Sequence, residues 1–124
     1  MIIKCELIKS GLASGSSPDY GRLIFKIFFE NNINSANIKF ITLFLETLIF
    51  GGAKKILVDM NDLEFIDSSG IGIFISIAKN IRTEKGEIAF VNVPEQLTGI
   101  FKVVRLHEYI KMFDSQGEAV KFLM

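Results

Sequence analysis

The chain has 124 residues with 14 basic and 14 acidic side chains, so its formal net charge is zero and it lacks the basic excess of a nucleic-acid-binding protein. Hydrophobic residues make up 49% and charged residues 23%, which is typical of a globular chain and excludes a disordered one. This length predicts a single domain over residues 1–124, large enough to bury its own core.

Cysteine usage and the apolar segments indicate a compartment. The single cysteine, Cys5, excludes an internal disulfide and favours a reducing environment, and we expect it to be a small buried hydrophobe. The first residues lack the basic start and apolar core of a secretory signal. The most apolar segment, residues 38–50, contains Lys39 and Glu46 and is too short to cross a bilayer. These features predict a cytoplasmic protein without a membrane span.

The chain begins with two predicted strands joined by a loop. Residues 2–8 and 23–29 are apolar runs, and we expect them to pair antiparallel because only a loop connects them. The segment from Ser10 to Gly21 is rich in glycine and serine, which predicts a surface turn. It does not end in Gly-Lys-Ser/Thr, so a phosphate-binding loop is disfavoured.

A polar turn over residues 31–37 leads into a helix over residues 38–50, with Asn34 or Ser35 as the expected cap. Gly51-Gly52 ends this helix. Five apolar residues form its core face: Ile38, Ile41, Leu45, Leu48 and Ile49. Four more lie beyond that face: Phe40, Leu43, Phe44 and Phe50. Either the amino-terminal segments cover them, or they form a partner surface or the contact of a homodimer.

The central stretch is a buried strand, an acidic loop and a helix over residues 69–83. The strand ends at Asp59, and the loop ends at Asp67-Ser68-Ser69-Gly70, where Asp67 or Ser68 would cap the helix. We expect Gly72 to allow close packing of the helix against the sheet. The free amides and positive dipole end of such a helix can hold a phosphate, either as a ligand or attached to a serine. From spacing alone, a simple helix cap is favoured.

The remaining chain predicts a strand over 88–93, a helix over 95–104, a strand over 109–113 and a terminal helix capped by Ser115. Strands that alternate with helices after an antiparallel pair predict an α/β fold with a mixed β-sheet of about five strands and about four α-helices. In such a sheet the loop at 67–69 and the turn at 31–37 both follow strands at the carboxyl edge, so we expect them to adjoin.

Catalytic and metal-binding interpretations are weaker. The sequence before Ser68 lacks the first glycine of a hydrolase elbow, and the only histidine, His107, is more simply a surface residue than a base for that serine. A phosphoacceptor Asp59 would need an acidic pair after the first strand, which is absent. Asp59, Asp62 and Asp67 are interpreted as solvated carboxylates, so no enzyme activity, metal or cofactor is predicted.

Residues 59–72 resemble the signature of the STAS family, the anti-sigma factor antagonist domains, and the likeness extends over residues 54–123. The resemblance implies the α/β fold described above and a regulatory switch. It implies that the unmodified domain binds an anti-sigma factor that is also an ATP-dependent serine kinase, that phosphorylation of Ser68 releases it, and that a phosphatase resets the domain. The implied partner-binding residues are Asp67, Ser68, Ser69, Gly70 and Asn34.

The chain departs from the family pattern in one place. Where the family usually has Gly-x-Leu/Ile-Asp, this sequence has Asn31 and Asn34, so one carboxylate is missing near the phosphorylatable serine. This change favours two alternatives: a scaffold STAS subunit of a signalling or transporter assembly, or a small-ligand or lipid-handling subunit. The intact Asp67-Ser68-Ser69-Gly70 run favours the switch.

Overall fold

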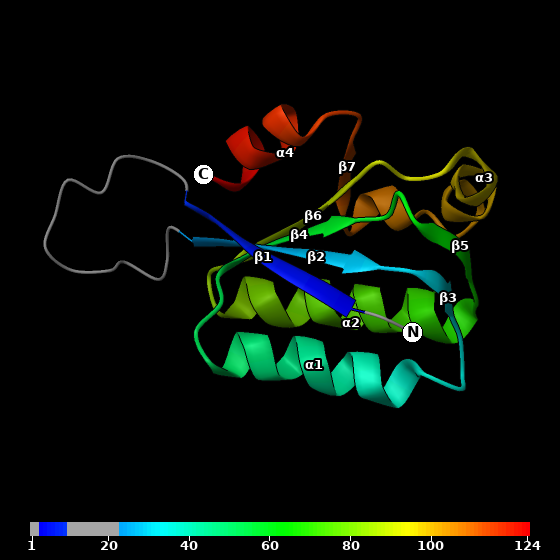
Figure 1. Ribbon diagram of the computed structural model, residues 1–124, viewed down its shortest axis with the longest axis horizontal. Helices are drawn as coiled ribbons and strands as arrows, with labels where there is room; N and C mark the ends of the chain where they lie inside the picture. Colours follow the sequence, from blue (N-terminus) through cyan, green and yellow to red (C-terminus); the bar gives the residue numbers. More distant parts are fainter. Residues whose placement is uncertain (1–2, 10–22) are drawn as a thin grey trace, which may run out of the picture.

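The computed structural model describes residues 3–9 and 23–124, and Figure 1 shows how their helices and strands are arranged. The predicted loop at 10–21 lies outside the described residues. The strands are β1 (Ile3–Lys9), β2 (Leu23–Phe29), β3 (Asn31–Ile33), β4 (Lys55–Asp59), β5 (Leu63–Ile66), β6 (Glu87–Val91) and β7 (Lys111–Phe113). The helices are α1 (Ile38–Phe50), α2 (Ser68–Thr83), α3 (Glu95–Val103), the 3₁₀ turn η2 (Leu106–Glu108) and α4 (Gln116–Leu123).

The main sheet has five strands in the order β1-β2-β4-β6-β7. β1 and β2 are antiparallel, and the other neighbours are parallel. The parallel connections pass through helices, as the alternation in the sequence requires. The predicted mixed five-stranded sheet with four α-helices is therefore confirmed for the described residues.

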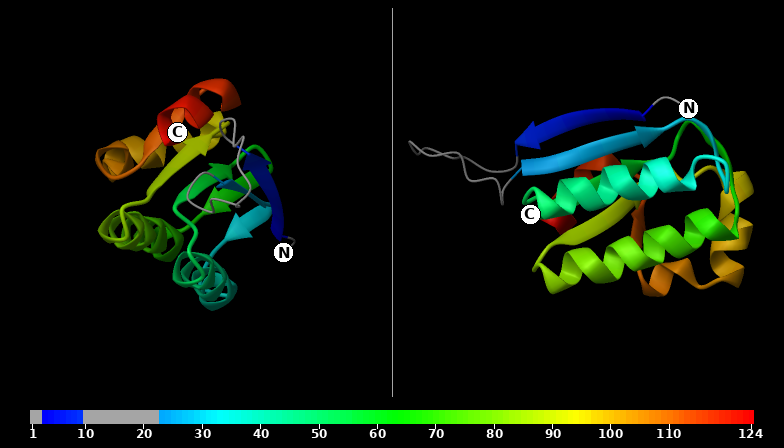
Figure 2. Two further views of the ribbon diagram at one scale, coloured as in Figure 1. Left: turned by 90° about the vertical axis from the view of Figure 1, so that its left-hand side faces the viewer. Right: turned by 90° about the horizontal axis from the view of Figure 1, so that it is seen from below.

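The sheet separates two hydrophobic cores. α1 and α2 lie side by side on one face, and α4 covers part of the other (Figures 1 and 2). Successive residues of β4 point to opposite faces, so Val58 enters the first core and Leu57 the second. In the first core the rings of Phe29, Phe74 and Phe90 meet edge to face, with centroids 5.9 Å and 5.1 Å apart.

A second, two-stranded sheet joins β3 and β5 in parallel, and the sequence did not predict it. Both segments were expected to be loops, because β3 is three residues long and mostly polar, and β5 lies inside the acidic stretch. Ile33 faces Ile66 in this pair, and both side chains are buried. The small sheet therefore fixes the segments that precede α1 and α2 beside one another.

Two further predictions about residue environments were wrong. Cys5 is exposed, because β1 lies at the edge of the sheet and no helix or strand of the described residues covers it. The residue at the amino terminus of α1 is Asn37, not Asn34 or Ser35, and its side chain makes no cap hydrogen bond. The helix still begins at Ile38, as predicted, and Asn34 bonds to its own backbone in the preceding turn, as described below.

Candidate functional site: the amino terminus of α2

Asp67 is the N-cap of α2 and lies at the centre of the site. Its Oδ1 accepts hydrogen bonds from the Gly70 N–H at 3.1 Å and from the Ser69 hydroxyl at 2.5 Å. Its Oδ2 accepts from the Ser35 N–H at 3.2 Å, across from another segment. The sequence predicted a cap by Asp67 or Ser68, and the structure assigns it to Asp67 because only its carboxylate reaches the first-turn amides.

The turn between β3 and α1 forms the other half of the site. The Asn34 side-chain oxygen accepts from the Ala36 N–H at 2.9 Å, which is an Asx turn. The Asp67 N–H donates to the Ile33 carbonyl at 3.0 Å, and this bond continues the β3–β5 pairing. The expectation that the turn adjoins the loop at 67–69 is therefore met, through the backbone of Ser35 and Ile33. The sequence did not reveal these two backbone contacts, because backbone groups leave no compositional signal.

The two adjacent serines have different environments. Ser68 is exposed at the first position of α2, whereas Ser69 is partly buried and its hydroxyl is held on the Asp67 carboxylate. The side-chain oxygen of Ser68 has no hydrogen-bond partner among those found in the described residues. A modifying group can therefore reach Ser68 without breaking a contact of the cap.

Gly70 is the glycine that allows close packing here. A Cβ at this position would lie 2.7 Å from Ile33 Cγ2 and 2.7 Å from Ile66 Cγ1. The sequence assigned this role to Gly72, which was wrong, because a Cβ at Gly72 would meet no atom within 4 Å. The absence of a side chain at Gly70 thus lets the first turn of α2 rest directly on the small sheet.

The hydrogen bonds to Asp67 lower the pKa of its carboxyl below the ordinary value. The largest cause is the Ser69 hydroxyl, followed by the Gly70 N–H, and both bonds favour the charged form. The cap is therefore anionic at neutral pH. A negative group added to Ser68 would be repelled by this charge. It would also be stabilised by the positive end of the α2 dipole.

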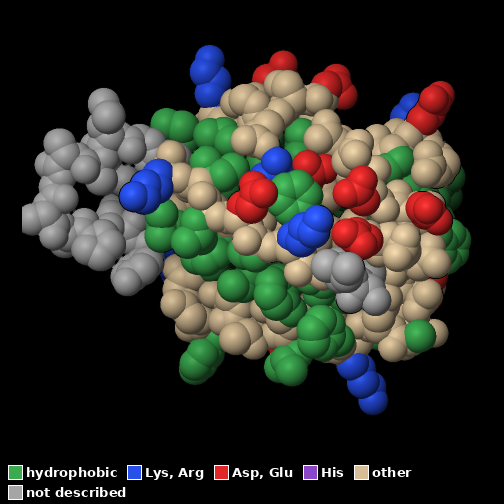
Figure 3. All heavy atoms as spheres, viewed as in Figure 1, with side chains coloured by type: hydrophobic (Ala, Val, Ile, Leu, Met, Phe, Trp, Pro, Cys, Tyr) green, Lys and Arg blue, Asp and Glu red, His purple; other side chains and the backbone are tan. Residues whose placement is uncertain are grey.

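A shallow groove runs between α1 and α2 from the site. Its first part, of about 430 Å³, is bordered by Ser69, Ile73 and Leu43, and its second part, of about 610 Å³, extends to Phe50 and Glu84. Three apolar side chains of α1 are exposed: Phe40 (62%), Leu43 (65%) and Phe50 (96%). Phe44, which the sequence grouped with them, is partly buried against the core. In Figure 3, hydrophobic side chains protrude at the lower margin of the molecule, where Figure 1 places α1.

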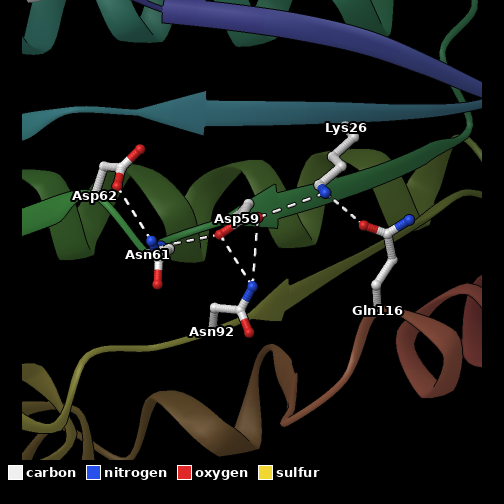
Figure 4. Close-up of polar contacts among 6 residues, drawn as sticks. All are labelled: Lys26, Asp59, Asn61, Asp62, Asn92 and Gln116. Atoms are coloured by element: carbon white, nitrogen blue, oxygen red, sulfur yellow. Dashed lines mark hydrogen bonds and ion pairs between the residues drawn. The ribbon is translucent and has the colours of Figure 1, made fainter.

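Asp59 is a buried structural residue, so its interpretation as a solvated loop carboxylate was wrong. Its Oδ2 lies 3.5 Å from the Lys26 Nζ, and its Oδ1 accepts from the Asn61 N–H at 2.9 Å (Figure 4). The Asn92 amide lies 3.4 Å from both oxygens, and Lys26 also donates to the Gln116 side chain. This network joins β2, β4, the residue that follows β6, and α4. A lone lysine in the apolar run of β2 was the sequence signal that could have revealed it.

No group of three or more acidic, histidine or cysteine residues in the described part of the chain is arranged to hold a metal ion. His107 lies in η2 and borders a cavity of about 300 Å³ with Phe101 and Met112, whereas Ser69 borders the α1–α2 groove. The structure does not bring this histidine to the serines. Among the helices of residues 3–9 and 23–124, none is both long enough and apolar enough to cross a membrane.

Comparisons with known proteins agree with this fold. A protein of Thermotoga neapolitana, provisionally named an anti-sigma factor antagonist, is 28% identical over 92 residues, which are 74% of this chain and 80% of that protein. The crystal structure of a Thermotoga maritima protein with the same provisional name has a TM-score of 0.76 at 23% identity, covering 81% of this chain and 86% of the other. The Bacillus cell fate determinant SpoIIAA, in its phosphorylated form, has a TM-score of 0.65 at 17% identity, covering 98% and 100%.

The family assignment rests on a match to a family model. The family model of the STAS domain matches residues 20–119, which is most of the chain. The match includes both segments of the site, the β3–α1 turn and the amino terminus of α2. The chain therefore belongs to the STAS domain family.

Proposed function

We propose that this chain is a non-catalytic regulatory domain that binds an anti-sigma factor when Ser68 is unmodified and releases it when Ser68 is phosphorylated. The partner is an anti-sigma factor with ATP-dependent serine-kinase activity, and a phosphatase restores the binding form. The support from relatives is that similar proteins are named anti-sigma factor antagonists and that SpoIIAA has been solved in a phosphorylated form.

The observation that carries the proposal is the contrast between the two serines. The Ser69 hydroxyl already donates to Asp67 at 2.5 Å, so phosphorylation of Ser69 would remove this hydrogen bond from the cap. Ser68 is exposed and can accept the phosphate while the cap stays intact. This contrast favours Ser68 as the modified residue.

The switch acts through charge. Phosphorylation adds about −1.5 to −2 charges at neutral pH. These charges lie next to the Asp67 carboxylate, on the surface that the unmodified domain offers to its partner. A partner shaped for a hydroxyl would have to desolvate them, whereas the amides and dipole of α2 stabilise them within the free domain. Phosphorylation therefore weakens binding without unfolding the domain.

The partner surface in this proposal consists of Asn34, Asp67, Ser68, Ser69 and Gly70, and continues along the exposed apolar side chains of α1. The Asx turn at Asn34 needs only a side-chain oxygen, which an aspartate also has. The departure from the family pattern at this position thus preserves the backbone of the site and changes only its charge.

The test uses two variants of Ser68 and a matched control at Ser69. The protein that co-purifies with the chain is identified and its binding is measured by calorimetry. Ser68→Ala should bind as tightly as the unmodified domain, and Ser68→Asp should bind more than tenfold more weakly, because a like charge at an interface costs several kcal/mol. Circular dichroism should show that both variants are folded.

Incubation with the partner and ATP, followed by phosphopeptide mapping, should place the phosphate on Ser68. Ser69→Ala should still be phosphorylated, whereas Ser68→Ala should not. Equal affinities for Ser68→Ala and Ser68→Asp, or a phosphate on Ser69, would contradict the switch and favour a constitutive scaffold subunit.

A further inference from the structure

β1 is an edge strand with one unpaired side. Among residues 3–9 and 23–124 it pairs only with β2, over Ile3–Lys9, and the order of the described strands ends there. Figures 1 and 2 show it at the outer margin of the sheet, with no described helix over that margin. The free side of an edge strand presents backbone N–H and C=O groups that can pair with another strand.

The side chains of β1 are also open to solvent. Lys4, Cys5, Glu6 and Leu7 are exposed, and Leu7 is 59% exposed. Proteins often protect an edge strand with charges of one sign, which repel a second copy. β1 instead carries charges of both signs, with Lys4 and Glu6 on either side of Cys5 and Lys9 at its end. Charges of both signs over this face are visible in Figure 3.

This arrangement is self-complementary in one register. When two identical strands pair antiparallel about a two-fold axis, residues at equal distances from the central residue face each other. With Cys5 at the centre, Lys4 faces Glu6 of the partner subunit, and Ile3 faces Leu7 of the partner subunit. The axis repeats both pairs, so the interface contains two opposite-charge pairs and two apolar pairs.

Neighbouring registers lack this match. With Glu6 at the centre, each glutamate would face its own copy, and with Lys4 at the centre, each lysine would do so. With Leu7 at the centre, Glu6 would face Ile8 of the partner subunit. Like charges opposite each other destabilise a strand pair. Only the register centred on Cys5 combines opposite charges with apolar pairs.

We propose that two copies of this chain associate through β1 in the register centred on Cys5, so that their two sheets become one continuous sheet. The contact is isologous, as most homodimer interfaces are. It uses none of the residues of the α2 site, so this proposal does not depend on the proposed function and its test is separate.

The first experiment measures the mass of the full chain by sedimentation equilibrium over a range of concentrations. A monomer–dimer equilibrium is expected. Lys4→Glu and Glu6→Lys each turn two opposite-charge pairs into like-charge pairs, so each should weaken the dimer about tenfold. The double variant K4E/E6K should restore it, and a mixture of the two single variants should form a heterodimer. Circular dichroism checks that each variant is folded.

The second experiment uses Cys5 as a probe of the register. Directly opposed residues have Cβ atoms about 4.5–5.5 Å apart, and the shortest of these separations reaches the upper end of the range in a disulfide, about 4.5 Å. Diamide should therefore join the two thiols, which lose two protons and two electrons as diamide is reduced to its hydrazine. Burial, and then the charge of Glu6, raise the pKa of the Cys5 thiol, so the reaction should be faster in alkaline buffer.

Two controls accompany the cross-link. Cys5→Ser should dimerise without a covalent bond, as the parent chain does before oxidation. In the double variant Cys5→Ser/Leu7→Cys, the single cysteine at position 7 faces Ile3 of the partner subunit and not a second cysteine. This variant should therefore cross-link far more slowly. A chain that is monomeric at all concentrations, a double variant that does not recover, or equally fast cross-linking in the moved-cysteine control would overturn the proposal.

Discussion

The amino termini of α2 and α4 begin in the same way and end up with different surroundings. Asp67 caps α2 through the Gly70 N–H at 3.1 Å, and Ser115 caps α4 through the Glu118 N–H at 3.3 Å. Both follow the same local rule, in which a short side-chain oxygen accepts from the first turn. The differences arise from what the next residue contacts.

At α4 the residue after the cap is tied to the sheet. The Gln116 side chain accepts a hydrogen bond from Lys26, which in turn pairs with the buried Asp59. At α2 the residue after the cap is Ser68, which is exposed while its neighbours hold the cap in place. A helix terminus whose polar groups are all used internally serves the fold. One that leaves a hydroxyl exposed on a rigid frame can also serve as a site of modification.

The largest effect is expected where α4 is anchored. Lys26→Met removes the cation beside Asp59, whose side chain is only 8% exposed, and should lower the free energy of unfolding by about 3 kcal/mol. Urea unfolding measures this. The double variant Lys26→Met/Asp59→Asn removes both charges and should recover most of the loss. Equal stability of the parent and Lys26→Met would show that the pair does not anchor α4.

The next effect is expected at Gly70, in the first turn of α2. Gly70→Ala places a methyl group 2.7 Å from Ile33 and Ile66, so it should cost about 1–3 kcal/mol in unfolding free energy. Gly117→Ala is the matched control in the first turn of α4, where a Cβ would meet no atom within 4 Å. It should be neutral or stabilising by up to about 1 kcal/mol. Thermal unfolding of both variants gives the contrast, and similar melting temperatures would contradict it.

The two caps should also differ in their response to pH. The pKa of Asp67 is lowered in the folded state, so its contribution to stability is present above the ordinary carboxyl pKa and is lost as pH falls through the folded value. The hydroxyl cap of Ser115 does not titrate. Unfolding free energies of the parent and Asp67→Asn, measured between about pH 6 and pH 2, should therefore converge in acid.

Ser69→Ala sharpens this test, because the Ser69 hydroxyl is the largest cause of the lowered pKa of Asp67. In this variant the acid-dependent loss should be smaller and should finish at a higher pH. Ser115→Ala should leave the pH profile unchanged in shape. A profile that Ser69→Ala does not alter would show that this hydroxyl bond does not stabilise the charged cap.

The smallest effect on stability is expected from Asn34→Asp, which supplies the carboxylate usual in the family. An aspartate oxygen can accept the same bond from the Ala36 N–H, so the unfolding free energy should change by less than about 0.5 kcal/mol. The rate of phosphate transfer to Ser68 should change, because a charge is added beside the site. A large loss of stability would show that the Asn34 amide group itself holds the turn.

The order and type of most elements could be predicted from the sequence. The bounds of α1 and β2 were predicted to the residue, because apolar periodicity and a double glycine mark them clearly. β3 and β5 were missed, since β3 has three mostly polar residues and β5 has four residues that lie within an acidic stretch, so neither shows a clear pattern. The predicted burial of Cys5 was wrong for a related reason. Only the strand order shows that β1 lies at the edge of the sheet.

The sequence by itself determined the alternation of strands and helices, a cap at Asp67 or Ser68 and the presence of two serines at the start of a helix, because these depend on neighbours within a few residues. Tertiary structure alone decided which serine is exposed, why Gly70 and not Gly72 lies against the small sheet, and that Lys26 neutralises Asp59. The contacts of Gly70 with Ile33 and of Lys26 with Asp59 join residues more than thirty positions apart in the chain. Such contacts exist only after the strands have paired, so local patterns cannot specify them.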